Sequence, residues 1–499
     1  MALDHNGRRH LRGRRLSLAA LALSSVSLGG CMSFSSDAGM STAQTVALVE
    51  LNKDVAKVTS EAQAVTAQDR VDILLRRSLT PDAAVQVALL KNRGLQASFN
   101  DLGVSEATFV QASLPPVPTI TLGRLSGPGS LDIERQILVS LLQLATLPAR
   151  QAIAANRFQA AQYRAAEAVL RLAAEARRQY YRTVASNQTV AFLEQALATA
   201  ESASTLATQL GETGALNKLE QAREHAFYTE LGAQLGKARI QQKVEREKLI
   251  RQLGLWGRDI DFRLPNSLPQ LPRGLESGTA LEARALTKRV DLQMARLDLR
   301  ALAGQYGLNQ ATRFVSAFDL ALANNAEVTK SIDVSEDGTP TLNRESNKYR
   351  GVIVEFAIPI YDFGESVIRG ARETYFASAN RLAQRAVNAR SEVREAYLRY
   401  RGQYDLTRHY QNSVLPLRKT IQDQALLQYS GMLIDVTQLI IDARARILSN
   451  VQAIEARRDF WIAATDLTAA IIGGGAGGAG DAEGAESGGV SSVAAATPD

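Results

Sequence analysis

Residues 88–97 read ALLKNRGLQA, and residues 285–294 read ALTKRVDLQM. Five of the ten positions carry the same residue in both stretches, at a constant offset of 285 − 88 = 197. Two helices rich in Ala and Leu can match this well by chance, so the stretch alone is weak evidence. A true repeat would make the fold unit about half the chain, and the segments that follow each copy decide the question.

The segments that follow come in the same order after both copies. Each half has two β-like stretches, then a long helical run, a break marked by glycine, and a second helical run. The β-like stretches lie near 118–125, 133–143, 313–323 and 350–360. At the glycine breaks the offset is 431 − 214 = 217, and the extra 20 residues fall in the polar segment 324–349. We therefore predict a duplication, with repeats over 79–270 and 271–472 and a loop over 324–349.

The helical runs are unusually long. The chain has neither Gly nor Pro from Ala149 to Leu210, and a helix from Pro148 to Leu210 would be about 90 Å long. A second helix is expected from about Glu365, and 433–472 again lacks Gly and Pro. Small residues, including Gly232 and Gly236, favour close packing of several helices, and a simple antiparallel coiled-coil stalk remains the alternative.

Both breaks between long helices have the same spacing. Leu219 follows Gly214 by five residues, and Val436 follows Gly431 by five. We expect each glycine to supply a left-handed turn and each apolar residue to restart a packing face. Plain turn chemistry explains the two glycines equally well.

The N-terminus predicts an exported lipoprotein. Five arginines precede the apolar stretch Leu16–Leu28, and LGGC follows at 28–31. This pattern is typical of a secretory signal over 1–30, with Cys31, the only cysteine of the chain, as the lipidated residue. An ordinary signal peptide with an incidental cysteine is the alternative. We expect a tether over 31–78 and a disordered Gly/Ala-rich tail over 473–499.

Removal of the signal also changes the charge. The signal carries five Arg and one Asp, so the formal charge falls from +6 to 6 − 4 = +2 and gives no basis for nucleic-acid binding. His225 and His409 are the histidines that remain, and neither has a partner at metal-ligand spacing. No nucleophile elbow, phosphate loop or dinucleotide fingerprint occurs. The sequence predicts no enzyme, no cofactor and no metal site.

The β-like stretches alternate in hydrophobicity. In 351–360, Val352, Val354 and Phe356 alternate with Ile353 and Glu355. Such strands suit lipid on one side and a wet lumen on the other, although a soluble sandwich would read similarly. No later stretch approaches the roughly twenty apolar residues of a membrane helix. Four strands cannot close a barrel, whereas three copies would supply twelve, so the membrane interpretation requires an oligomer.

The chain resembles the TolC-like outer membrane factors over about 79–472. The resemblance is carried by QASLPPVPTITL (111–122), VEFAIPIYDFG (354–364) and the two glycine-marked hairpin tips. The equivalent place in the first half, LQLATLPAR (142–150), lacks the Asp-Phe-Gly. The resemblance implies a mainly α protein with a small β part, whose homotrimer forms an α-barrel tunnel and a shared 12-stranded outer-membrane β-barrel.

The resemblance also implies a function and sites. The chain would be the exit duct of a tripartite efflux system, anchored in the outer membrane and extending into the periplasm, with a periplasmic adaptor and an inner-membrane pump as partners. The tips at Gly214, Leu219, Gly431 and Val436 would contact the adaptor, Asp435 or Asp442 would narrow the tunnel entrance, and 324–349 would be an extracellular loop. A type I protein secretion channel and a non-conducting structural lipoprotein that spans the periplasm are the alternatives.

Overall fold

The computed structural model describes residues 34–214, 216–334, 340–431 and 433–473. The predicted signal over 1–30, the lipidation site Cys31 and nearly all of the C-terminal tail lie outside these residues. Within them the fold is mostly helical with a small antiparallel sheet, which confirms the expected fold class.

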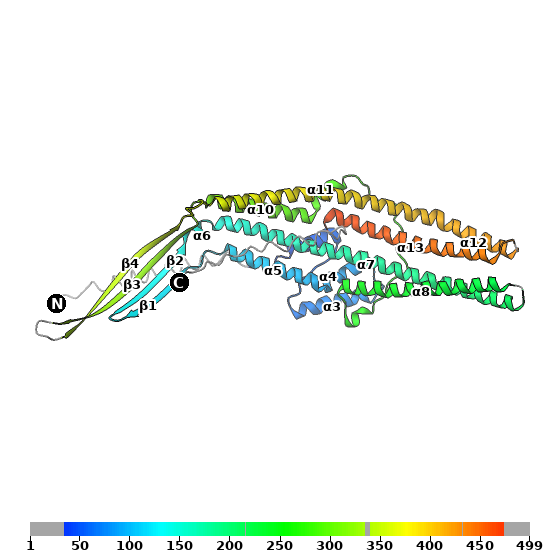
Figure 1. Cartoon of the computed structure of the whole chain (residues 1–499), viewed down its shortest axis with the longest axis horizontal. Helices are drawn as coiled ribbons and strands as arrows, with labels where there is room; N and C mark the ends of the chain where they lie inside the picture. The colour runs from blue at the N-terminus through cyan, green and yellow to red at the C-terminus, as the bar shows by residue number, and fades with distance from the viewer. Residues whose placement is uncertain (1–33, 215, 335–339, 432, 474–499) are drawn as a thin grey trace, which may run out of the picture. The chain divides into compact units, whose positions relative to one another are not determined.

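The elements follow the chain in the order that the repeat predicts (Figure 1). Those of the first half are α2 (Ser41–Val46), η1 (Ala47–Leu51), α3 (Glu61–Leu75), α4 (Pro81–Lys91), α5 (Arg93–Ser113), β1 (Thr119–Gly127), β2 (Ser130–Ser140), α6 (Leu141–Ala145), α7 (Leu147–Glu212) and α8 (Lys218–Leu253). Those of the second half are η2 (Gly257–Ile260), α9 (Leu281–Lys288), α10 (Val290–Ala311), β3 (Ala317–Val334), β4 (Pro340–Ala357), α11 (Glu365–His409), η3 (Tyr410–Val414), α12 (Leu415–Ser430) and α13 (Val436–Ile472).

The repeated stretch marks a break between two helices in each half. Asn92 separates α4 from α5 with φ −66° and ψ 116°, and Arg289 separates α9 from α10 with φ −56° and ψ 122°. The two residues are 289 − 92 = 197 positions apart, the same offset as the repeat itself. The similar sequences therefore have the same backbone conformation at the same point.

A glycine closes each half against this break. Gly254 caps the end of α8 with φ +72°, and a Cβ there would lie 2.9 Å from the Asn92 Cα and the Lys91 carbonyl oxygen. Gly473 caps the end of α13 with φ +92°, and a Cβ there would lie 3.0 Å from the Val290 nitrogen. Both the left-handed backbone and the close approach exclude a side chain. The returning helix of each half thus ends against the helix break of the same half.

Two compact units divide the chain, and they are not the two repeats. One unit contains 100–162, 294–383 and the segment up to Gly39, and the other contains 40–99, 163–293 and the chain from Gln384. Each unit takes segments from both halves. The sheet and the start of α7, up to Gln162, lie in the first unit, and the rest of α7 with α8, α12 and α13 lies in the second.

The four strands form one antiparallel sheet in the order β1-β2-β3-β4 (Figure 1). Its register places apolar residues opposite one another on one face, as in the row Ile120, Ile137, Leu322 and Val352. On this face Phe318 stacks on Phe356 with ring centroids 4.7 Å apart. Residues on the other face are smaller or polar, as in the row Ser140, Asp319 and Glu355. Directly opposed residues lie on the same face of a sheet. The register therefore confirms the predicted alternation of apolar residues with smaller or polar ones along the strands.

The predicted loop over 324–349 is wrong. Strands β3 and β4 continue through most of it, with pairs such as Ala326 with Lys348 and Ile332 with Leu342. The polar composition suggested a loop, but the residues of this extension are exposed or half-buried, so polar side chains are compatible with a ladder of backbone hydrogen bonds. β4 also ends at Ala357, before the predicted end at 360.

The core of the helical unit contains an aromatic cluster. Tyr181 stacks on Trp461 and Tyr400 stacks on Phe460, each pair with ring centroids 5.5 Å apart. The buried hydroxyl of Tyr180 donates to the Leu79 carbonyl oxygen at 3.0 Å. Among the helices that the structure describes, none combines the length and the hydropathy that a membrane span requires.

Candidate functional site

The sequence-predicted site residues lie at the turns of the two long hairpins in the helical unit. Gly214 and Leu219 belong to the turn between α7 and α8, and Gly431, Asp435 and Val436 belong to the turn between α12 and α13. We refer to these two turns and the helix ends beside them as the tip region. Each hairpin turns where a helix ends at a short segment whose side chain caps the next helix.

The turn between α7 and α8 is closed by glycine and asparagine. Gly214 has φ +76°, and the Leu216 amide donates to the Leu210 carbonyl oxygen at 3.1 Å. Asn217 then caps α8 by accepting the Glu220 amide hydrogen bond at 2.9 Å. The predicted left-handed glycine is confirmed at this turn.

The same prediction is wrong for the other turn. Gly431 has φ −86° and ψ 5°, which any residue adopts, so its turn needs no left-handed glycine. The turn is held by the Leu433 amide, which donates to the Gln428 carbonyl oxygen at 2.8 Å. Asp435 caps α13 by accepting the Gln438 amide hydrogen bond at 2.9 Å.

Leu219 and Val436 follow their glycines at the same spacing, but they differ in helix position and in exposure. Leu219 is the second residue after the Asn217 cap and is 61% exposed. Val436 is the first residue after the Asp435 cap and is only 4% exposed. The second turn is one residue longer up to its cap, which rotates the following helix. Leu219 therefore offers its side chain to a partner, whereas Val436 packs inside the chain.

Val436 belongs to a buried cluster that joins the two hairpins. We call it the hairpin cluster, and its buried members are Val190, Leu193, Ala200, Phe227, Leu231, Leu235, Val436 and Ile440. They come from α7, α8 and α13. Burying each large side chain contributes about 1.5–3 kcal/mol, so the cluster helps to hold α13 against the first hairpin.

Charged groups border the hairpin cluster on its exposed side. Arg444 of α13 forms an ion pair with Glu230 of α8 at 2.7 Å, and its guanidinium lies 5.4 Å from the centroid of the Phe227 ring. Arg223 of α8 donates a hydrogen bond to the Thr437 hydroxyl. These contacts contribute little to stability, because exposed ion pairs are worth about 0–1 kcal/mol. They favour one arrangement of α8 against α13.

The two predicted constriction residues are exposed or half-buried, and both accept a hydrogen bond from Gln438. The carboxylate of Asp435 caps α13 through the Gln438 backbone, and Asp442 accepts a hydrogen bond from Gln438 Nε2 at 3.1 Å. Capping α13 is a sufficient role for Asp435 within the single chain. Neither carboxylate has an ion-pair partner among the described residues.

Glu224 is a buried acid in the tip region that the sequence prediction missed. It is 7% exposed, and burial raises the pKa of its carboxyl group. It lies on one stripe of α8 with Phe227, Leu231 and Leu235, at intervals of three, four and four residues. This helical spacing was a signal that could have predicted the burial of Glu224.

The histidines do not form a metal site. The described residues contain no group of three His, Cys, Asp or Glu side chains that could hold a metal ion. His225 instead lies 3.4 Å from the Ser204 hydroxyl, measured from its Nδ1 atom. The tip region therefore offers packing surface, caps and one buried acid.

Solved structures with the same fold are outer-membrane channels. The Campylobacter jejuni CmeC outer membrane channel is 15% identical, with a TM-score of 0.62 over 86% of this chain and 92% of its own. The open state of the Neisseria gonorrhoeae MtrE outer membrane channel is 16% identical, with a TM-score of 0.60 over 78% of this chain and 88% of its own. CusC, described for its transmembrane channel formation, is 15% identical, with a TM-score of 0.63 over 78% of this chain and 91% of its own.

No model of a known protein family matches the chain, and no curated protein matches it. The solved structures nevertheless match it over nearly their whole length, and they confirm the fold that the resemblance implied. At identities of 13–17% they establish the fold alone.

Proposed function

We propose that this chain, which has the fold of TolC-like outer-membrane channels, is the exit duct of a tripartite efflux system. The observation that carries the proposal is the match in fold to channel structures over 78–86% of the chain. The duct conducts small solutes or ions passively through a water-filled tunnel, and no bond chemistry takes part.

The functional form is a homotrimer. Strands β1 and β4 are the two edges of the sheet and have no partner strand on their outer sides within the described chain. Open edges with exposed apolar side chains, such as Leu122 on β1 and Val354 on β4, favour pairing with another copy. Three copies supply twelve strands, an even number that closes into one sheet of ordinary size for an outer-membrane protein.

The tip region is the docking end for a periplasmic adaptor, which links the duct to an inner-membrane pump. Leu219 at 61% exposure and Leu433 at 77% exposure present apolar side chains at the two turns. Exposed apolar residues around a polar rim are typical of an interaction surface. Gly214 supplies the left-handed residue of the first turn, and Gly431 lies in the second turn in an ordinary conformation. Val436 supports this surface from inside and does not itself contact the adaptor.

Two measurements test the channel together. We expect the purified mature protein to be trimeric, by mass photometry or native mass spectrometry, and to conduct ions in planar lipid bilayers. A monomer that conducts nothing, even when Asp435 and Asp442 are both changed to Asn, would contradict the proposal. It would favour a structural lipoprotein instead. Transport of an unfolded polypeptide, but of no small solute, would favour protein secretion.

We also propose that Cys31 carries the lipid that anchors the chain to the outer membrane. The support is the position of this lone cysteine directly after an arginine-rich and apolar leader. Intact-mass analysis should find a mature N-terminus at Cys31 that bears acyl chains, and Cys31→Ser should lack them. An unmodified Cys31 in the membrane-purified protein would refute the anchor and leave the channel untouched.

A further inference from the structure

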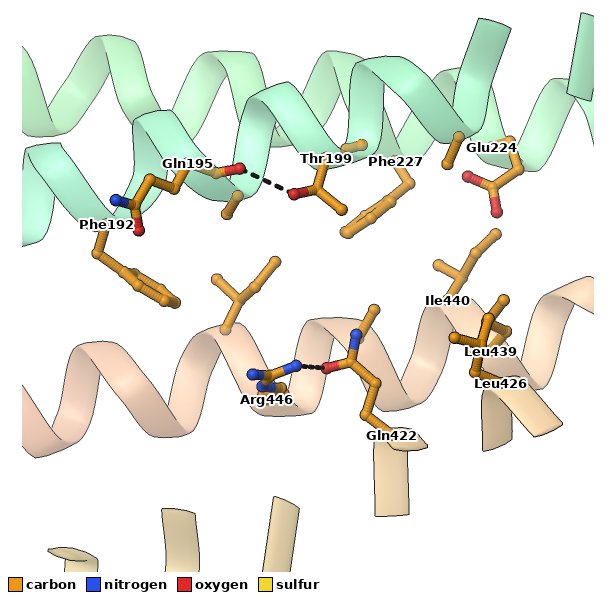
Figure 2. A pocket seen from close by; sticks show the side chains of 15 residues that line it. Phe192, Gln195, Thr199, Glu224, Phe227, Gln422, Leu426, Leu439, Ile440 and Arg446 are labelled. Atoms are coloured by element: carbon orange, nitrogen blue, oxygen red, sulfur yellow. Dashed lines mark hydrogen bonds between the residues drawn. The ribbon is translucent and has the colours of Figure 1, made fainter. Parts of the chain in front are cut away.

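The tip region contains a cavity that the channel function does not require. It has a volume of about 390 Å³ and lies between α7, α8, α12 and α13 (Figure 2). Its walls are mainly apolar, with Phe192, Phe227, Leu439 and Ile440 among the lining residues. Cavities of about 300–1,000 Å³ with apolar walls and few polar groups are typical of small-molecule sites.

Glu224 supplies the strongest polar feature of this cavity. Figure 2 shows Phe192 at one end and Glu224 at the other, with the Glu224 carboxylate on the side of Ile440. Glu224 is 7% exposed, and none of the hydrogen bonds or ion pairs of the described residues involves its carboxylate, whose oxygens keep some accessible surface at the cavity wall. A carboxylate at the wall of a mainly apolar cavity, with no cationic partner, favours a bound cation or a proton there.

The nearby arginine side chains bind other partners. Arg446 lines the cavity but donates its hydrogen bond to the Gln422 side chain, on the wall opposite Glu224 (Figure 2). Arg444 is paired with Glu230. Burial alone accounts for the raised pKa of Glu224, and no neighbouring charge contributes to it. The carboxylate therefore lacks a positive partner among the residues that the structure describes.

We propose that this cavity binds an amphipathic organic ammonium, with its aromatic or aliphatic body between Phe192 and Phe227 and its charge on Glu224. The carboxylate matches the ammonium in charge and accepts its N–H hydrogen bonds, which are stronger than neutral ones because both partners are charged. The apolar walls match the body of the ligand. A free inorganic cation would gain nothing from them.

The site links the two halves of the chain. Its walls come from α7 and α8 of the first repeat and from α12 and α13 of the second. An occupant therefore contacts both hairpins, beside the hairpin cluster that joins them. Because a ligand stabilises the state that binds it, the bound amine holds the two hairpins together.

The test uses the full-length protein in detergent and two probes of the same shape. 1-Naphthylmethylammonium carries the charge, and 1-naphthalenemethanol is its neutral counterpart. Isothermal titration should show the ammonium binding at least about tenfold more tightly than the alcohol, which corresponds to about 1.4 kcal/mol. Glu224→Gln should remove this preference and leave the affinity for the alcohol unchanged.

Two further variants complete the design. Glu230→Gln, one of the exposed acids of the same helix, should bind both probes as the wild type does. Ala443→Phe, which fills the cavity, should abolish binding of both. Equal affinity of the wild type for the two probes, an unchanged preference in Glu224→Gln, or binding that survives Ala443→Phe would overturn the site. Bilayer conductance of the wild type is measured separately, so a failure of the site and a failure of the channel are distinguishable.

Discussion

Two glycines are required where the returning helix of each half ends. Gly254 and Gly473 both end a returning helix with positive φ, and both lie against the helix break of their own half. The glycines at the tips stand out in the sequence, whereas these two do not. Their importance follows from a backbone approach between segments about 160–180 residues apart, since 254 − 92 = 162 and 473 − 289 = 184. No local pattern encodes such a contact.

Replacing Gly254 with Ala should destabilise the chain by about 1–3 kcal/mol. The added Cβ would require a left-handed conformation and would lie 2.9 Å from backbone atoms of Lys91 and Asn92. The midpoint of urea unfolding, followed by circular dichroism, measures the change.

Gly236→Ala in the same helix is the matched control. Gly236 lies within α8, and a Cβ added to it would have no neighbouring atom within 4 Å outside its own helix backbone. Alanine there should leave the stability unchanged or raise it by up to about 1 kcal/mol, because alanine is the better helix former. Equal effects of the two substitutions would contradict the role assigned to Gly254.

Glu224 should make stability depend on pH. Its pKa is raised in the folded chain, so the folded state binds the proton more tightly than the unfolded state does. The stabilisation is complete below the ordinary glutamate pKa of about 4.3 and is lost as the pH rises through the folded-state value. Urea midpoints should therefore fall over this interval in the wild type.

Glu224→Gln isolates this effect. The amide keeps the size of the side chain and removes the titration, so the fall in midpoint over this pH interval should be smaller than in the wild type. Glu230→Gln, at an exposed ion pair, should retain the wild-type fall. A pH profile of Glu224→Gln that coincides with that of the wild type would show that the carboxyl group does not titrate in its buried site.

At the scale of helices, the caps decide where the hairpins turn. Asn217 begins α8 and Asp435 begins α13, each through a side-chain oxygen that accepts the amide three residues later. The one-residue difference between the two turns buries Val436 and exposes Leu219. The spacing from glycine to apolar residue did not reveal this, because the cap sets the start of the helix and the glycine does not.

Asp435 can be tested as a cap and as a constriction separately. Asp435→Ala should destabilise the chain by about 1 kcal/mol, because the Gln438 amide loses its acceptor. Asp435→Asn keeps a capping oxygen and removes the charge. Its stability should therefore be close to that of the wild type, as judged by urea unfolding.

Bilayer conductance then addresses the constriction. If Asp435 narrows the tunnel entrance of the trimer, Asp435→Asn should raise the leak conductance, while Asp442→Asn reports on the second candidate. An unchanged conductance in Asp435→Asn, together with a loss of stability in Asp435→Ala, would leave Asp435 as a helix cap and nothing more.

The sequence predicted the elements better than their ends and contacts. The long helix α7 and the start of α11 at Glu365 agree with the predictions. For α7 the reason is local, because a run rich in Ala and free of Gly and Pro favours a helix. The extension of β3 and β4 was missed, because exposed polar strands look like loops. The spacing within α8 carried a signal for the burial of Glu224, but the cavity walls from α13, such as Leu439, lie 439 − 224 = 215 residues away in the sequence and needed the structure.

At the scale of the whole molecule, the sheet of a single chain leaves apolar side chains exposed. Every residue of β4 except Asn347 is exposed in the single chain, and one face carries Val352, Val354 and Phe356. An apolar face of this size on a lone sheet is unstable in water. The sheet thus requires lipid, further copies or both, as the proposed trimer provides.

Val352 and Ile353 offer a matched pair for the last prediction. They are neighbours in β4 with 64% and 49% exposure, and they lie on opposite faces of the sheet. Val352 opposes Leu322 on the apolar face, and Ile353 opposes Ala321 on the other face.

If the apolar face meets lipid, Val352→Arg should cost up to about 2–4 kcal/mol per copy, and Ile353→Arg in a wet lumen should cost much less. Outer-membrane fractionation and trimer yield measure both: Val352→Arg should lose the assembled trimer, whereas Ile353→Arg should assemble and change only the ion selectivity. The opposite pattern would assign the lipid to the other face, and equal tolerance of both would mean that the sheet does not enter a membrane.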